Sequence, residues 1–311
     1  MATTSPFAEV AARVRNWSRW GVDDQIGTLN LIDDEARRRA AGAVRSGKAF
    51  ALGLALSEAE GIQAGFIEGR VNPMRAMIQV NHPLSADPEW ICSSEDVVTM
   101  ALQCATHWDA LAHCSYKGTI YNGYPASSVD EHGASRCGIH NLTTVVSRGV
   151  LLDVARTHAV PVLEPGYAIT PEDLDAACAL AGTDVLPGDM VLVRTGQMVH
   201  LALLDRDLIA YTWPSPGLTI ETAEWFHARD VAAVATDTLV FEVFPSQYED
   251  TYLPVHLLHL VEMGMTQGQN WVLDALATDC AEDGQYTFLL DATPLPFTNG
   301  LGSPLNPLAL K

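Results

Sequence analysis

The 311-residue sequence is poor in basic residues and lacks long apolar runs. It holds 18 Lys and Arg against 38 Asp and Glu, which gives a formal net charge of −20. A surface this acidic repels phosphate backbones and anionic lipids, so neither nucleic acid nor a membrane surface is an expected partner. Its apolar runs are also far too short to span a bilayer.

Close cysteine pairs are missing as well, because the six cysteines are scattered without any C-x-x-C motif. In a chain of this length that distribution favours reduced thiols over a disulfide framework. The N-terminus has no apolar stretch followed by a cleavage site, so we expect a cytoplasmic protein. No repeat or linker divides the chain. We expect a single domain over 1–311, with an N-terminal arm of about 1–48 and a C-terminal tail of about 293–311.

Alternating strand and helix patterns predict an α/β fold. Helical patterns cover 33–47, 170–182 and 219–230. For the second helix, Thr170 is the expected N-cap, reinforced by Asp173, and Gly182 the expected end. Strand patterns cover 49–56, 77–80, 96–103, 149–155, 189–195, 230–237 and 286–292. Several carry β-branched residues on both faces, which predicts a sheet buried on both sides. Pro and Gly in 294–307 suggest a tail over the surface or over a neighbouring subunit.

The stretch "QCATHWDALAH", residues 103–113, contains a candidate metal site. If the strand that begins near 97 extends through 106, His107 and Asp109 share one face and Gln103 lies on the same face. An imidazole and a carboxylate can hold a divalent ion that activates water, and a second imidazole such as His113 can carry a proton. A strand end with ordinary buried histidines is the alternative, and the spacing alone does not decide between them.

The same stretch resembles the H-x-G-T-H-x-D-x-P-x-H signature of the cyclase family of metal-dependent hydrolases, which includes kynurenine formamidase and isatin hydrolase. Further similar blocks follow in the same order, among them "RWGVDDQIGTLNLI" (19–32) and "GMTQGQNWVLDALA" (264–277). The resemblance covers nearly the whole chain. It implies a swivelling β/β/α fold, a homodimer or homotetramer, a Zn or Mn site, and water attack on a cyclic amide, formamide or lactone-type carbonyl.

Carried over by position, the resemblance makes His107 and Asp109 metal ligands and His113 the catalytic histidine. Gln103 stands where the signature has its first histidine. The family's histidine and glutamate near the C-terminus correspond best to His256 and Gln269.

His259 competes with His256, since both fall on one helical face, and a core histidine is as good an interpretation of either. Trp17, Trp20 and Trp90 are candidates for an aromatic pocket, although core or interface packing is the favoured explanation for each of them. The stretch 240–250 is a candidate lid or substrate-facing loop.

Both glutamines replace a stronger ligand with a neutral amide and leave Asp109 as the only anionic ligand. Two divalent ions would then repel each other without compensation, so we expect one ion. Amide oxygen favours Mn²⁺, with Zn²⁺ second. The expected substrate is a small molecule, aromatic or cyclic. A metal-assisted cyclase or dehydratase and a non-catalytic ligand binder are the alternatives to a hydrolase.

Overall fold

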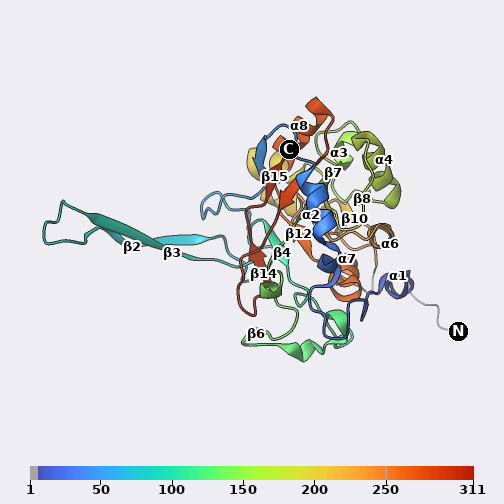
Figure 1. The fold of residues 1–311 in the computed structure, drawn as a ribbon, viewed down its shortest axis with the longest axis horizontal. Helices are drawn as coiled ribbons and strands as arrows, with labels where there is room; N and C mark the ends of the chain where they lie inside the picture. Colours follow the sequence, from blue (N-terminus) through green and yellow to red (C-terminus); the bar gives the residue numbers. More distant parts are fainter. Residues whose placement is uncertain (1–5, 249–250) are drawn as a thin grey trace.

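The computed structural model describes residues 6–248 and 251–311. Most strands among these residues join one nine-stranded sheet, which runs through the body of the molecule (Figure 1). Its strands run in the order β1 (Ala49–Ala51), β15 (Leu308–Leu310), β13 (Thr287–Asp291), β7 (Val146–Asp153), β9 (Met190–Arg194), β11 (Ala233–Thr236), β12 (Gln267–Gln269), β4 (His107–Asp109) and β14 (Gly302–Pro304). The four central strands from β7 to β12 are parallel, and antiparallel strands extend the sheet at both ends.

Helices pack against both faces of this sheet, as the strand patterns predict. They are α1 (Pro6–Val14), α2 (Asp34–Ala41), α3 (Val154–Thr157), α4 (Pro171–Ala181), α5 (Leu208–Thr212), α6 (Glu221–Ala228), α7 (Pro254–His256) and α8 (Asp274–Asp283), together with the wider helical segments η5 (Met198–Leu204) and η6 (Leu257–Met263). No helix among the described residues is long and apolar enough to cross a membrane.

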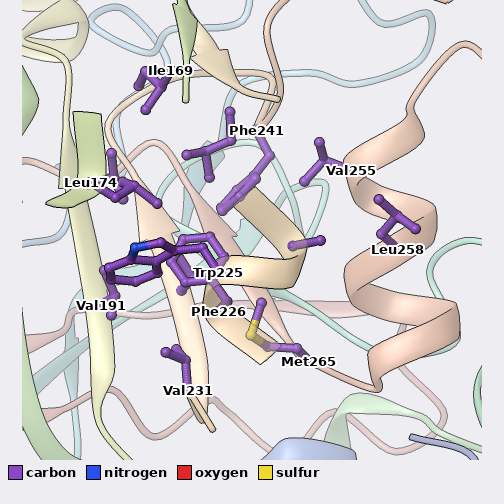
Figure 2. Packing of buried hydrophobic residues seen from close by; sticks show 14 of the residues in the cluster. Ile169, Leu174, Val191, Trp225, Phe226, Val231, Phe241, Val255, Leu258 and Met265 are labelled. Carbon is purple, nitrogen blue, oxygen red and sulfur yellow. The ribbon is translucent and has the colours of Figure 1, made fainter. Parts of the chain in front are cut away.

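One face of the sheet carries the larger core cluster. It contains Val191 of β9, Leu174 of α4, Trp225 and Phe226 of α6, and Leu258 of η6 (Figure 2). Each fully buried side chain of this size contributes about 1.5–3 kcal/mol. The opposite face packs on α8 and on the segment that includes Leu29 and Ile32. Because both faces are covered, the central strands are apolar throughout rather than alternating.

The predicted cap of α4 is confirmed. Thr170 and Asp173 form a reciprocal capping box, and Gly182 closes the helix in the left-handed conformation. The helix predicted over 33–47 is shorter than expected, because Gly42 caps it after Ala41.

The strand predicted over 96–103 is wrong in its second half. β3 (Cys92–Thr99) pairs only with β2 (Met74–Pro83), and this two-stranded hairpin projects far from the body (Figure 1). The chain then turns at 101–106 before β4 begins at His107. Residues 100–106 therefore do not continue the strand that carries His107 and Asp109.

The C-terminal tail is also more than a surface cover. β14 and β15 both join the main sheet, β14 as the edge strand beside β4 and β15 between β1 and β13. Segments this short carry too little periodicity to be recognised as strands, and their pairing partners lie far away in the sequence. The N-terminal arm likewise packs into the fold through α1, whose Phe7, Val10 and Val14 enter the larger core.

Gly27 fixes the arm against the helix that ends at Gly264. Gly27 has φ +56°, and a Cβ there would overlap the Gly264 carbonyl, which accepts a hydrogen bond of 2.8 Å from the Thr28 amide. Gly182 has nearly the same φ, +60°, but a Cβ there would meet nothing within 4 Å.

We therefore expect Gly182→Ala to lower the free energy of unfolding by about 1 kcal/mol, the cost of left-handed backbone alone. Gly27→Ala adds a backbone clash and should cost about 3 kcal/mol or more. Urea denaturation of the two variants measures the difference. Equal losses would show that the contact between Gly27 and Gly264 is not a fixed part of the fold.

Candidate metal centre

The candidate site lies where β4 pairs with β12. In the register of these strands Gln269 is opposite His107, and Gly268 is opposite Trp108. Trp108 points to the other side of β4, packs against Trp271 and donates its indole N–H to Ala292 at 2.7 Å. This anchor sends His107 and Asp109 to the face opposite Trp108, as the sequence predicts.

Asp109 is the centre around which the other polar groups gather. Its Oδ1 lies 3.5 Å from His107 Nε2 and 3.7 Å from His113 Nε2. Its Oδ2 accepts a hydrogen bond of 2.9 Å from the Gln269 amide and lies 3.9 Å from His256 Nε2. Four of the six predicted site residues thus surround Asp109.

Backbone and carboxylate partners orient the imidazoles of His107 and His256. The Ala105 carbonyl lies 2.7 Å from His107 Nδ1, and Glu242 contacts His256 Nδ1 in the same way. Since a carbonyl or carboxylate oxygen can only accept, both Nδ1 atoms carry the proton. In the neutral rings both Nε2 lone pairs are therefore directed towards Asp109.

This arrangement fits a cation. Asp109 Oδ1 and Gln269 Oε1 are both buried, and neither has a hydrogen-bond partner. A buried anionic oxygen without a donor is costly, and two imidazole lone pairs nearby add further negative potential. A metal ion would satisfy all of them. In the described part of the chain, however, no group of three or more His, Cys, Asp or Glu is close enough as placed to hold a metal, so the donors surround Asp109 without a finished ligand set.

The titration behaviour of these groups reflects burial and mutual proximity. Burial alone would raise the pKa of Asp109, but His113 and His107 outweigh it and hold that pKa well below its usual range. Burial lowers the pKa of His113, while Asp109 opposes the shift. For His256 burial also acts to lower the pKa, yet the neighbouring Glu242 prevails and raises it.

Two predicted or competing residues lie elsewhere. Gln103 sits in the turn before β4, where its amide nitrogen packs against Gly302 of β14, and it does not line the cavity beside Asp109. Its predicted position failed because the strand expected to carry it is interrupted. His259 points into the core between Phe226 and Phe241, and burial lowers its pKa to about 3. Of the two histidines, His256 is therefore the one beside Asp109.

A cavity of about 400 Å³ opens above these groups. Of the six predicted residues, His107, Asp109, His113, His256 and Gln269 line it. Its aromatic wall is formed by Phe66, Phe244 and Tyr252 rather than by the tryptophans considered from the sequence. Phe244 is the middle ring, edge-to-face with Phe66 at 6.1 Å and with Tyr252 at 5.2 Å.

The tryptophans have other surroundings. Trp17 donates to the Val261 carbonyl, the Trp20 ring lies beneath the Arg19 guanidinium, and Trp90 is exposed on the hairpin. In the predicted lid stretch, Val240 and Phe244 do line the cavity, and residues 249–250 lie outside the described part of the chain.

Glu242 is a residue of the candidate site that the sequence analysis missed. It is fully buried behind His256, and its Oε1 accepts from the backbone amides of Val255 at 3.0 Å and His256 at 3.1 Å. Its Oε2 contacts His256 Nδ1. A single acid within the apolar run "TLVFEVF" was the available signal, because a buried carboxylate needs such partners.

The chain belongs to the cyclase family. Residues 75–243 match the family model described as "Putative cyclase". A crystal structure described as a novel cyclase is 35% identical, with a TM-score of 0.87 over 97% of this chain and 99% of that chain.

More distant structures share the fold. Isatin hydrolase A from Labrenzia aggregata, bound to benzyl benzoate, has a TM-score of 0.62 at 21% identity, over 87% of this chain and 94% of that chain. A potential metal-dependent hydrolase with cyclase activity has a TM-score of 0.54 at 18% identity, over 84% and 96% of the two chains. No curated protein matches the sequence. These likenesses support an enzyme of the metal-dependent hydrolase type at the level of the family.

The contact with Glu242 predicts which nitrogen of His256 is protonated. In Glu242→Gln the amide can still accept from the two backbone N–H groups, but its NH₂ then faces His256 Nδ1 and must donate to it. The neutral ring should therefore move its proton to Nε2. The lost charge-assisted bond should lower the free energy of unfolding by roughly 1–3 kcal/mol.

Nitrogen-15 NMR of histidine-labelled protein, recorded at a pH where the ring is neutral, reports the tautomer directly. Glu282→Gln, an exposed position in α8, is the matched control and should leave the spectrum unchanged. If His256 keeps its Nδ1 proton in Glu242→Gln, the orienting role assigned to Glu242 is wrong.

Proposed function

We propose that this chain is a metal-dependent hydrolase that opens a C–N bond of a cyclic amide or arylformamide, or a related lactone-type carbonyl bond. One observation carries the proposal. At the floor of a cavity with an aromatic wall, Asp109 Oδ1 is buried without a hydrogen bond, and the lone pairs of His107 and His256 lie beside this carboxylate. Membership of the cyclase family supports the same reaction class.

His107, Asp109, His256 and Gln269 are the proposed ligands of one divalent ion. Gln103, the third ligand expected from the sequence, is left out because its side chain lies outside the cavity. Asp109 is the only buried carboxylate among the described residues that line this cavity, so a second dication would find little compensating charge. The amide oxygen of Gln269 favours Mn²⁺, with Zn²⁺ second.

His113 is the proposed proton carrier. When bound, the ion would supply the usual chemistry of such sites, a water of lowered pKa and a polarised carbonyl. The His113 side chain is 25% exposed, against 2% for His107 and 7% for His256, so it is the imidazole that substrate and water can reach. It would accept the proton of the attacking water and return it to the leaving nitrogen or oxygen.

Metal content tests the ligand set. Protein purified without chelator should carry one metal ion per chain, as measured by inductively coupled plasma mass spectrometry. Asp109→Asn removes the only ligand charge and should lower Mn²⁺ affinity by 100-fold or more, on the order of a lost charged partner. Asp205→Asn, at an exposed position, should not change it. Two zinc ions per chain would contradict the single-ion arrangement.

Turnover tests the reaction. Protein with Mn²⁺, incubated with aromatic lactams and lactones, should yield ring-opened products heavier by one water in a mass spectrum, and arylformamides should yield the free arylamine and formate. Loss of water would favour a cyclase or dehydratase instead. A thermal shift without any product would favour a ligand binder.

His113→Ala should lower turnover by roughly 10²–10⁴-fold, the usual contribution of a general base, and retain the metal. His132→Ala is the matched control, since that side chain is 80% exposed in a loop. If turnover survives in His113→Ala, another group carries the proton.

We also propose that the molecule is a homodimer or homotetramer. The β2–β3 hairpin extends from the body with Met77, Ile78, Val80 and Trp90 exposed (Figure 1). An isolated two-stranded hairpin is marginal in water, and a second copy of the chain would cover these apolar side chains. Light scattering should give the mass of a dimer or tetramer, and a monomer would contradict this proposal.

A further inference from the structure

A loop of the N-terminal half forms one side of the cavity, and the fold fixes it at several points. Asn72 Oδ1 accepts from the Gln63 amide at 2.9 Å, and Gln63 Nε2 donates to the Cys104 carbonyl at 2.8 Å. Arg206 donates to the carbonyls of Glu60 and Gly61 at 2.9 and 3.0 Å. The segment between Gln63 and Asn72 is therefore closed at its base.

Arg70 comes from this closed segment and lines the cavity together with Asp109 and His113. It is half-buried, and its guanidinium makes no hydrogen bond or ion pair with any residue that the structure describes. Burial lowers the pKa of Arg70, while Asp109 and Cys104 oppose the shift. An arginine stays protonated even so, which leaves a positive charge and hydrogen-bond donors at the wall of the cavity.

The acids near Arg70 do not satisfy it. Asp109 is near enough to affect its pKa but is not in ion-pair contact, and its oxygens face the imidazoles and Gln269. Glu68 also lines the cavity, but it is exposed and forms no ion pair with Arg70. Glu242 is engaged by His256. A half-buried guanidinium on a segment closed at its base can bind a carboxylate with two parallel hydrogen bonds.

We propose that Arg70 is a specificity-determining residue that binds a carboxylate carried by the substrate, so that the preferred substrates are aromatic acids. The ring would lie against Phe66, Phe244 and Tyr252, and the carbonyl to be attacked would lie towards His113 and Asp109. This inference rests on the proposed function for the reaction, and on the cavity alone for the binding. The carboxylate formed by hydrolysis is a second source of the same chemistry, which the test distinguishes.

Binding of benzoate and of its neutral isostere benzamide tests the assignment without any turnover. Calorimetric titration of the full chain is done both with Mn²⁺ and with chelator, because a bound metal also attracts benzoate. In chelator, the wild type should bind benzoate tenfold or more tightly than benzamide. Arg70→Gln should reduce the affinity for benzoate to that for benzamide, and it should leave the affinity for benzamide unchanged.

Two further variants control for indirect effects. Arg45→Gln, at an exposed position between α2 and β1, should bind benzoate like the wild type. Arg70→Lys should retain part of the affinity, since it keeps the charge but not the planar pair of donors. A thermal midpoint of Arg70→Gln close to that of the wild type would confirm that the fold is intact. Benzoate affinity that does not change in folded Arg70→Gln overturns the proposal.

A kinetic pair then separates the two sources of carboxylate. Formanilide and 4-formamidobenzoate differ only in the acid group. Arg70→Gln should raise KM tenfold or more for 4-formamidobenzoate alone, with kcat unchanged, as expected for uniform binding. Equal KM changes for both substrates, or a change in product inhibition alone, would overturn a substrate carboxylate. If neither compound is hydrolysed, the proposed reaction fails, while the benzoate titration still decides the role of Arg70.

Discussion

The site depends on one electrostatic constraint, which is that too many acceptors converge on too few donors. Asp109 Oδ1 is buried without a hydrogen bond, and the lone pairs of His107 and His256 point towards the same carboxylate. The Gln269 NH₂ is the nearest donor, shared between Asp109 at 2.9 Å and His256 at 3.2 Å. Such a cluster lowers the free energy of unfolding unless a positive charge enters it, and the rest of the fold must offset this cost.

The surrounding strands make this cluster rigid while leaving its rim to loops. β4 is held between β12 and β14, its Trp108 is anchored in the core, and Thr266 donates to the Asp109 carbonyl at 2.6 Å. The wall that a substrate would touch comes instead from the segments around Phe66 and Phe244. The buried donors and the aromatic wall therefore lie on different elements, so the wall can change without disturbing the donors.

Local signals in the sequence predicted what depends on neighbours along the chain. The capping box at Thr170, the buried parallel strands and the shared face of His107 and Asp109 all follow from periodicity and side-chain chemistry. What failed depends on distant partners. Gln103 left the site because β3 pairs with β2 instead of running on into β4, and β14 and β15 acquire their strand character only by joining the sheet. Glu242 and Arg70 carry no motif, so only their placement in the fold identifies them.

The two glutamines that depart from the family signature thus have different meanings. Gln269 remains beside Asp109, where its amide can offer either NH₂ or oxygen, whereas Gln103 is packed against Gly302 and adds nothing to the cavity. With Gln103 outside the cavity, fewer atoms are available there to bind a metal ion. Arg70 adds a positive charge to the same cavity. Each positive group raises the electrostatic free energy of placing a further cation in the cavity. Among the described residues that line the cavity, only Asp109 is both anionic and buried. A cavity that already contains a guanidinium can compensate one divalent ion with a substrate carboxylate, but a second ion would add repulsion that no side chain offsets.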